Sequence, residues 1–275
     1  MERLQIALEK ARASRRAATS SGTPGGETAP MSRSGRGPRG NWIAMEPLEI
    51  HQALLARNRV VPFGGDSAAA PFDLLRTRVL QQIREPGWRR IAVVSPSPGA
   101  GKTTMVANLA FALGRQSDTH TIALDFDLRR PTLAKTLGHM PRHNMAAVIE
   151  GRVPFADHGL CHGDNLIFGL NHEAARKSSE LLQSRRTADL LAELEQAYAP
   201  DTLLFDMPPL LGSDDAIGFL RQVDCALIVA EAERTPISQL DAIERQVADI
   251  TAVLGVVLNK CNFAGDSYGS DYGYY

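Results

Sequence analysis

The sequence predicts a doubly wound α/β fold with a mostly parallel sheet and helices on both faces. Short apolar, often β-branched runs alternate with helical patterns between residues 90 and 258. A glycine- and proline-rich segment joins the first of these runs to a helical pattern, and aspartates stand at the ends of two later runs. This alternation is typical of parallel sheets, because parallel strands need crossover connections that are usually helices.

The predicted elements follow in order along the chain. Residues 90–95 read RIAVVS, a buried strand by their β-branched run, and the Ala- and Leu-rich residues 102–114 are expected to be helical. The next strand is expected at residues 121–124, followed by a turn and a short helix at 131–137. A longer helix over residues 179–197 carries leucines at helical spacing. Further strands are predicted at residues 202–205, 226–230 and 253–258, with helical patterns between them.

The N-terminal part differs from the rest in composition. Residues 1–60 carry ten Lys or Arg and five Asp or Glu, whereas the remainder carries twenty and twenty-six. Residues 1–18 are expected to form a short amphipathic basic helix. Residues 19–40 are expected to be a disordered linker, because sixteen of these twenty-two residues are Gly, Pro, Ser or Thr. The expected continuation is a connecting segment at 41–65, a main domain at 66–262 and a flexible Tyr-rich tail at 263–275.

Composition excludes several classes of protein. The mildly acidic main domain argues against a protein whose body coats nucleic acid, and no apolar run is long enough to span a bilayer. No secretory signal is visible. The three cysteines, Cys161, Cys225 and Cys261, are widely separated and form no disulfide framework, so a reducing cytoplasm is the expected compartment.

The segment SPSPGAGKTT at residues 95–104 lies between the first predicted strand and the helix that follows. Residues 98–101 allow backbone N–H groups to turn inward around a phosphate, and the helix presents its positive end to the same charge. Lys102 is expected to reach the β- and γ-phosphates and the Thr103 hydroxyl to ligate Mg²⁺. A turn with an incidental lysine is the alternative. The strand–loop–helix context favours the phosphate loop, so the predicted fold is of the P-loop NTPase type.

Carboxylates follow two of the predicted strands. Asp125 and Asp127 lie in IALDFDLRRP, and Asp206 lies in LLFDMPP. The carboxyl ends of parallel strands form the edge at which open α/β sheets bind ligands. Carboxylates at this edge suit a hydrated Mg²⁺ and a base for a hydroxyl nucleophile. The alternative is that the aspartates after the first of these strands only cap the next helix.

The order of these segments, together with a terminal tyrosine cluster, resembles the bacterial tyrosine kinases of capsule and exopolysaccharide synthesis. The resemblance covers about residues 66–275 and includes softer matches at SSELLQS and GVVLNK. It implies catalytic roles for Lys102, Asp125 and Asp127, with Asp125 as base, and a metal site formed by Thr103, Asp127 and Asp206. ATP and Mg²⁺ are the implied cofactors. The nucleotide is expected to contact Ser97, Pro98, Gly99, Ala100, Gly101, Lys102, Thr103, Thr104 and Asn259.

The chain differs from two sequence motifs of related P-loop proteins. Partitioning and division-site ATPases carry a signature lysine five residues before the loop lysine, where this chain has Ser97. Many of the tyrosine kinases carry an ExxRxxR helix that closes a ring of subunits. The aligned positions here are Ala70, Asp73 and Arg76, so we expect a monomer or a loose association instead of a stable ring.

Four of the five tyrosines, Tyr268, Tyr272, Tyr274 and Tyr275, fall in the final eight residues. They are the expected phosphoacceptors, and the alternative is a low-complexity tail without that role. The fourteen residues after Cys261 can extend on the order of 45 Å, so transfer between subunits is expected.

The sequence therefore predicts an ATP-dependent protein-tyrosine autokinase that regulates exopolysaccharide or capsule synthesis and export. A non-catalytic, nucleotide-gated adaptor ATPase of a polysaccharide export complex is the main alternative. A cytoskeletal-type ATPase is a third hypothesis, which Ser97 disfavours. The resemblance implies an activating membrane chain-length-determinant (co-polymerase) protein, other copies of the chain and a cognate tyrosine phosphatase as partners, and no nucleic acid. It implies a cytoplasmic protein held at the inner face of the plasma membrane through a partner.

Overall fold

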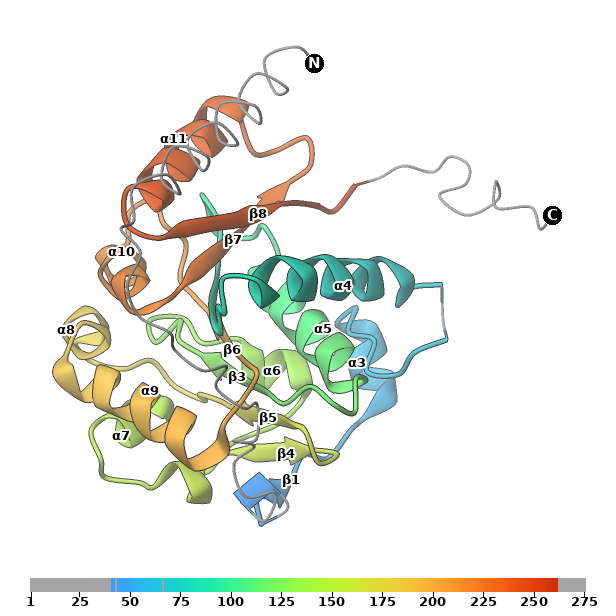
Figure 1. The fold of residues 1–275 in the computed structure, drawn as a ribbon, viewed down its shortest axis with the longest axis vertical. Coiled ribbons are helices and arrows are strands. Elements are labelled where there is room, and N and C mark those ends of the chain that lie inside the picture. The colour runs from blue at the N-terminus through green and yellow to red at the C-terminus, as the bar shows by residue number, and fades with distance from the viewer. Residues whose placement is uncertain (1–40, 43, 66, 262–275) are drawn as a thin grey trace, which may run out of the picture. The chain divides into compact units, whose positions relative to one another are not determined.

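The structure is a computed structural model that describes residues 41–42, 44–65 and 67–261 (Figure 1). The predicted leader helix, linker and tyrosine-rich tail lie outside the described residues. In the described part of the chain, none of the helices combines the length and hydrophobicity that spanning a bilayer requires.

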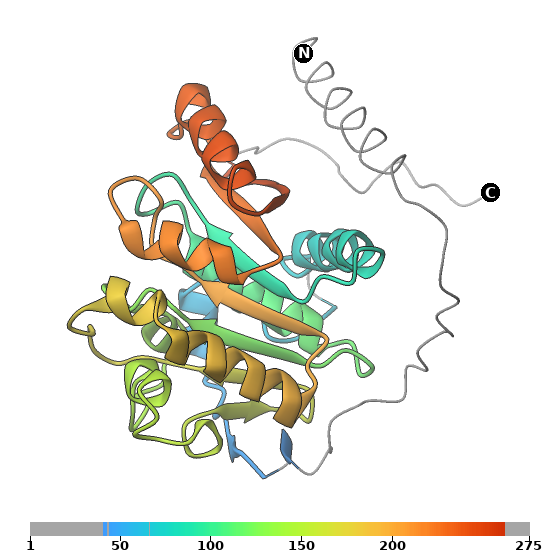
Figure 2. The same ribbon diagram turned by 60° about the vertical axis from the view of Figure 1, so that its left-hand side comes forward.

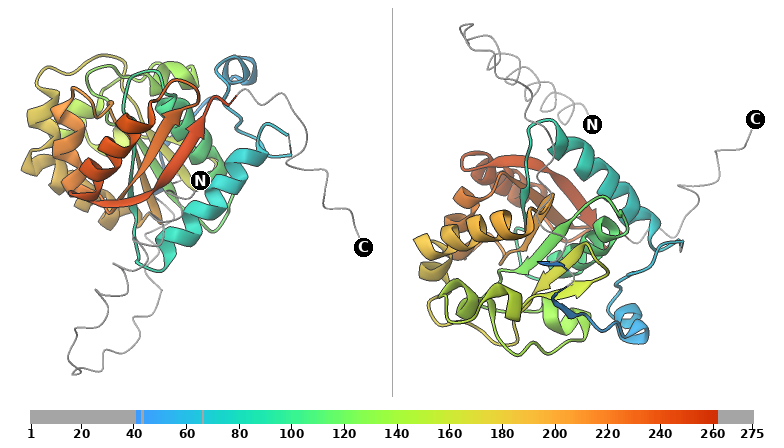
Figure 3. Two further views of the ribbon diagram at one scale, coloured as in Figure 1. Left: turned by 90° about the horizontal axis from the view of Figure 1, so that it is seen from above. Right: turned by 60° about the horizontal axis from the view of Figure 1, so that its bottom comes forward.

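The described residues form an eight-stranded sheet with the order β1-β4-β5-β3-β6-β2-β7-β8. Every neighbouring pair is parallel except β4 and β5, which form an antiparallel hairpin. This hairpin and β1 lie at one edge of the sheet (Figure 3, right). The strands are β1 Glu46–Pro47, β2 Arg90–Val94, β3 Thr121–Asp125, β4 Leu160–His162, β5 Leu166–Gly169, β6 Thr202–Asp206, β7 Cys225–Glu231 and β8 Ala252–Asn259.

Helices cover both faces of the sheet, and each face has its own apolar core (Figures 1 and 2). This arrangement confirms the predicted doubly wound, mostly parallel α/β fold. One face carries α3 Gln52–Arg57, α4 Ala70–Arg84, α5 Lys102–Gly114 and α6 Leu133–Leu137. The other carries α7 Met145–Ile149, α8 Ser178–Leu182, α9 Arg185–Tyr198, α10 Asp214–Phe219 and α11 Ile237–Ala248. Two short 3₁₀ helices lie at Phe155–Asp157 and Leu220–Gln222.

The prediction of one continuous helix over residues 179–197 was wrong. The chain forms α8 and α9 instead, and Ser184 between them is extended, with φ −72° and ψ 155°. The Ser184 hydroxyl accepts a hydrogen bond from the Thr187 amide and donates one to the Leu181 carbonyl (2.7 Å). A serine at this position caps a new helix, so the leucine periodicity continues across the break without a continuous helix.

Residues 41–65, expected to be a connecting segment, contribute a strand and several buried side chains to the body. Trp42 is 1% exposed and donates a hydrogen bond from its indole Nε1 to the Tyr198 carbonyl (3.0 Å). Its ring packs edge-on against the rings of His120 and Tyr198. Further along, the Asn108 side chain on α5 accepts from the Val61 amide (2.9 Å) and donates to the Arg59 carbonyl (2.9 Å). These contacts hold the segment against the domain.

The helix that aligns with the ring-closing segment of the kinases makes its charged contacts within the chain. The Asp73 carboxylate on α4 pairs with Arg76 at 2.9 Å and with Arg115, after α5, at 2.6 Å. Arg76 also donates to the Ala112 carbonyl at 3.1 Å. The two charged side chains at these positions therefore fasten α4 to α5.

We expect Trp42→Ala to lower the free energy of unfolding by about 3–5 kcal/mol, because it removes a buried aromatic ring and leaves the Tyr198 carbonyl without its donor. Chemical denaturation of the full chain measures this. Trp88 is only half-buried, so Trp88→Ala is the matched control with a smaller expected loss. Equal losses for the two variants would contradict the anchoring role of Trp42.

Candidate active site

The glycine-rich loop between β2 and α5 has the conformation that its sequence requires. Gly99 and Gly101 have φ values of +86° and +92°, in the left-handed region that favours glycine. A Cβ atom at Gly101 would also lie 2.2 Å from the amide nitrogen of Asn259. The loop leads directly into α5, whose first-turn N–H groups and positive end suit a phosphate.

Lys102, the first residue of α5, is largely buried at the base of this loop. Its ammonium donates to the Ser95 hydroxyl at 3.1 Å, and that hydroxyl donates to the Ser97 carbonyl at 2.8 Å. Burial lowers the pKa of Lys102, and the nearby Asp206 and Asp127 oppose this effect. The Lys102 ammonium is therefore held beside the loop, close enough to Asp206 and Asp127 for their charges to affect its pKa.

Two carboxylates lie side by side at the ends of neighbouring strands. Asp125 ends β3 and Asp206 ends β6, and the register of the two strands pairs these residues directly. Both are buried, at 0% and 1% exposure. One Asp125 oxygen, Oδ2, accepts the Leu133 amide at 3.2 Å. Among the described residues, Asp125 Oδ1 and both Asp206 oxygens have no hydrogen-bond partner.

Burial changes the proton affinity of both groups. It raises the pKa of Asp125 well above its usual value, and the charge of Asp206 raises it further. Burial also raises the pKa of Asp206 to about 7, and the nearby Thr103 hydroxyl and the positive charge of Lys102 only partly oppose this rise. Buried carboxylate oxygens without donors are what a bound cation would satisfy, so Asp206, which has two such oxygens, fits a ligand of Mg²⁺.

Asp127 lies two residues beyond the end of β3 and is only partly buried. Its Oδ1 accepts the Arg130 amide at 3.0 Å, which fixes the carboxylate at the start of the loop. Burial raises the pKa of Asp127, while the Arg130 amide and the Lys102 charge lower it. The Thr103 hydroxyl, on the first turn of α5, lies 3.0 Å from that of Thr132. Asp127 and Thr103 are therefore two further oxygen-bearing side chains, close to Lys102, that could bind a metal ion.

The end of β8 supports the glycine-rich loop from its other side. Asn259 donates to the Ala100 carbonyl at 2.8 Å, and Lys260 donates to the Gly99 carbonyl at 2.7 Å. Lys260 also pairs with Glu231 at 3.1 Å. The sequence predicted that Asn259 contacts the nucleotide, but it indicated no role for Lys260, which follows it in the GVVLNK segment.

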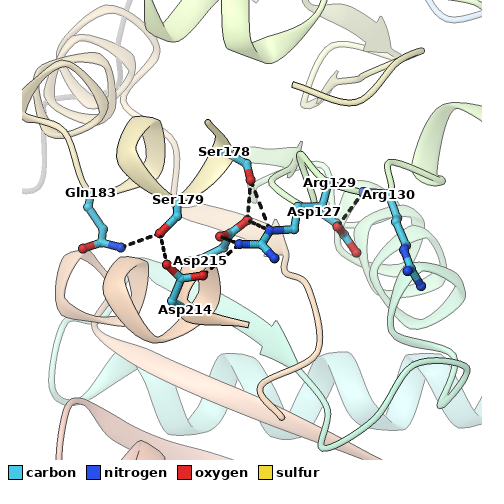
Figure 4. A network of polar contacts seen from close by, with 8 residues as sticks. All are labelled: Asp127, Arg129, Arg130, Ser178, Ser179, Gln183, Asp214 and Asp215. Atoms are coloured by element: carbon cyan, nitrogen blue, oxygen red, sulfur yellow. Dashed lines mark hydrogen bonds and ion pairs between the residues drawn. The ribbon is translucent and has the colours of Figure 1, made fainter. Parts of the chain in front are cut away.

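A network around Arg129 was also missed from sequence (Figure 4). The Arg129 guanidinium donates to both oxygens of the fully buried Asp215, at 2.9 and 2.8 Å, and to Asp214 at 2.8 Å. The Ser178 hydroxyl donates to Asp215 at 2.6 Å, and the Ser179 hydroxyl donates to Asp214 at 2.6 Å. Because Arg129 is two residues from Asp127, this network joins the loop after β3 to α8 and α10.

A cavity of about 650 Å³ opens beside the loop on the α4–α5 face. Its lining includes Gly101, Thr104 and Asn259, and Val61 and Phe72 contribute apolar surface. A mostly apolar cavity with a few polar groups, next to a phosphate-binding loop, suits a nucleoside.

The structure brings most of the predicted site residues together at the carboxyl edge of the sheet. They are the loop residues 97–104 with Lys102 and Thr103, the three aspartates 125, 127 and 206, and Asn259. The predicted phosphoacceptors, Tyr268, Tyr272, Tyr274 and Tyr275, lie outside the described residues. The glycine-rich loop and the strand-end aspartates together define a P-loop nucleotide-binding protein.

The chain belongs to the CobQ/CobB/MinD/ParA nucleotide binding domain family, which its residues 91–267 match. It is 29% identical over 186 residues to the tyrosine-protein kinase CpsD of Streptococcus pneumoniae serotype 4, covering 65% of this chain and 79% of that protein. It is 32% identical over 179 residues to the succinoglycan biosynthesis transport protein ExoP of Rhizobium meliloti, covering 62% and 22%.

Among solved structures, the chain is similar to the kinase domain of the Escherichia coli tyrosine kinase ETK. The TM-score is 0.66 with 25% identity, over 76% of this chain and 82% of that one. The predicted resemblance to bacterial tyrosine kinases is therefore confirmed. The chain spans only 28% of the length of another curated relative, AmsA of Erwinia amylovora.

We expect the contribution of Asp206 to the stability of the nucleotide-free protein to fall as the pH rises from about 4 to 7. The pKa of Asp206 is about 7 in the folded protein and near 4 when unfolded, so its carboxyl binds more protons in the folded state in this range. Buried His158, whose pKa is lowered to about 4, acts in the opposite direction, so the difference between the unchanged protein and Asp206→Asn isolates the Asp206 contribution. Between pH 5 and 7.5, the unfolding temperature of the unchanged protein should fall relative to that of Asp206→Asn. The exposed Asp118→Asn is the control, and an unchanged slope in Asp206→Asn would contradict the prediction.

Proposed function

We propose that this protein is an ATP- and Mg²⁺-dependent protein-tyrosine kinase that regulates capsule or exopolysaccharide synthesis and export. The observation that carries the proposal is the buried pair Asp125–Asp206, set beside Lys102 at the end of the phosphate loop. A protein that only binds nucleotide needs the loop and a metal ligand. It has no need of a second buried carboxylate with a free oxygen.

The loop and Lys102 would bind the triphosphate, and the cavity beside Gly101 and Asn259 would take the adenosine. Thr103, Asp127 and Asp206 are the residues that would hold Mg²⁺. When bound, the ion neutralises negative charge that develops on the transferring phosphoryl group. Lys102 supplies a further positive charge, preorganised by its contact with Ser95.

Asp125 is the residue we assign as base. Its Oδ2 is held by the Leu133 amide, whereas Oδ1 has no partner among the described residues and remains open to accept a proton. Asp125 must be ionised to accept a proton from a tyrosine hydroxyl, whose own pKa is near 10, and a Mg²⁺ bound at Asp206 would favour that ionised form. In the step, the tyrosine oxygen bonds to the γ-phosphorus and the bond to the β-phosphate oxygen breaks. The hydroxyl proton passes to Asp125, and ADP leaves.

The partners and location of the protein follow from the proposed activity and from the relatives, one of which is named a succinoglycan biosynthesis transport protein. We propose activation by a membrane chain-length-determinant protein, transfer between copies of the chain and reversal by a cognate tyrosine phosphatase. The proposed location is the cytoplasmic face of the plasma membrane, where that partner would hold the protein. Because Asp73 and Arg76 are engaged within the chain, we propose a monomer or loose association without the partner.

Lys102→Met should abolish phosphotyrosine formation while leaving the fold intact, because a thioether cannot supply the charge that the transferring phosphoryl group needs. The measurement is an anti-phosphotyrosine blot of purified protein after incubation with ATP and Mg²⁺. Lys135→Met, on the exposed surface of α6, is the matched control and should keep full activity. ATP binding without phosphotyrosine in the unchanged protein would favour the adaptor ATPase instead.

Changing Tyr268, Tyr272, Tyr274 and Tyr275 together to Phe should remove most of the phosphotyrosine, because these are the proposed acceptors. Mass spectrometry of the unchanged protein should place phosphate on them and little on Tyr198, which is buried. Tyr198→Phe is the control and should leave the total unchanged. If the fourfold variant kept its phosphotyrosine, the tail would not be the acceptor.

A further inference from the structure

The last residue of β8 and the residue after it both reach the glycine-rich loop. β8 ends at Asn259, and Lys260 follows it in the left-handed region, with φ +58°. In an extended strand, the side chains of consecutive residues point to opposite faces. The left-handed turn at Lys260 ends this alternation, and the two side chains donate to the carbonyls of two consecutive loop residues, Ala100 and Gly99. A lysine is therefore held in a conformation that few residues other than glycine adopt.

These two contacts fix the direction of two N–H groups in the loop. Among the described residues no peptide bond is cis, and in a planar trans peptide the C=O and N–H groups point in opposite directions. A donor that holds the Gly99 carbonyl therefore turns the Ala100 N–H away from that donor. In the same way, the donor on the Ala100 carbonyl turns the Gly101 N–H away. Consecutive N–H groups that are turned inward form an anion-binding concavity.

The end of β7 holds the Lys260 ammonium in place. β7 and β8 lie side by side at one edge of the sheet (Figure 1), and their register pairs Glu231 with Asn259. The Glu231 carboxylate lies 3.1 Å from the Lys260 ammonium, and the Glu231 side chain is only 13% exposed. The Ala232 amide donates to the Asn259 carbonyl at 2.8 Å. The position of the ammonium is therefore set by a carboxylate on a strand of the sheet.

Lys260 also lies in the lining of the 650 Å³ cavity that suits a nucleoside, so a direct contact with the nucleoside is the alternative role. The hydrogen bonds of the ammonium favour a role in the loop. It donates to the Gly99 carbonyl at 2.7 Å and pairs with Glu231, so two acceptors of the protein already direct it toward the loop backbone. A group held in this way acts on the phosphates through the loop.

We propose that Lys260 is a positioning residue for phosphate binding. Held by Glu231, it fixes the peptide between Gly99 and Ala100 so that the Ala100 N–H points at a phosphate oxygen of the bound nucleotide. The proposal rests on the nucleotide binding that the proposed function requires, and it does not depend on the identity of the phosphoacceptor. It predicts that Lys260 affects the affinity for the phosphates of a nucleotide and leaves the affinity for the nucleoside unchanged.

The test compares two ligands that differ in their phosphates. The affinities of the full-length protein for ADP with Mg²⁺ and for adenosine are measured by displacement of a fluorescent ADP analogue. Lys260→Met should weaken ADP binding about tenfold, as expected for the loss of a hydrogen bond from a charged donor, and adenosine binding less than twofold. Unfolding temperatures should agree between the variant and the unchanged protein.

Arg234→Met is the matched control. Arg234 pairs with the same Glu231 carboxylate at 3.4 Å, is 76% exposed, and within the described part of the chain donates to no residue of the loop. Its loss removes one positive charge from the same carboxylate and should change both affinities less than twofold.

A second variant separates the side chain from the backbone. Lys260→Gly suits the left-handed conformation at this position, so it removes the ammonium without straining the turn and should weaken ADP binding as much as Lys260→Met. The loss should be the same at low and high salt, because the direction of an N–H group is not screened by ions.

Three results would overturn the proposal. Equal losses for ADP and adenosine would place Lys260 against the nucleoside. An equal loss in Arg234→Met, or a loss that high salt removes, would show a general effect of charge. ADP binding that both Lys260 variants leave unchanged would show that the loop does not need the lysine. Lys260-dependent ADP binding in a protein that never forms phosphotyrosine would support the proposal and overturn only the kinase assignment.

Discussion

The register between β3 and β6 is the constraint on which the rest of the site depends. It places two carboxylates at adjacent positions on neighbouring strands, both removed from water. Two buried like charges are unfavourable, so the pair holds protons more tightly than exposed carboxylates do unless a cation balances it. Lys102 provides part of that balance. The unsatisfied oxygens leave room for a second positive charge, which ties the protonation of the site to its ligands.

Two groups of contacts hold the loops on either side of this pair, one from β8 and one from β5. The β8 side, through Asn259 and Lys260, fixes the backbone of the phosphate loop. The β5 side, through Asn171 and the Arg129 network, fixes the loop that carries Asp127. Figure 3 (left) shows the sheet between its two helical layers.

The sequence predicted the part of the site that is local in the chain. Lys102 and Thr103 follow a glycine-rich loop, and Asp125 and Asp206 directly follow predicted strands, so the topology of a parallel sheet brings them together. The contact between Arg129 and Asp215 could not be predicted in this way, since the residues are 86 positions apart and no local pattern links them. The hairpin of β4 and β5 was missed because its strands have only three and four residues. The break before α9 was hidden by leucines that keep helical spacing on both sides of Ser184.

Trp42 fixes the start of the described chain to one edge of the sheet. Its neighbours His120 and Tyr198 come just before β3 and β6, at the amino edge of the sheet. The phosphate loop and the aspartates lie at the opposite, carboxyl edge. The start of the described chain is therefore fixed at the edge of the sheet opposite the candidate nucleotide site.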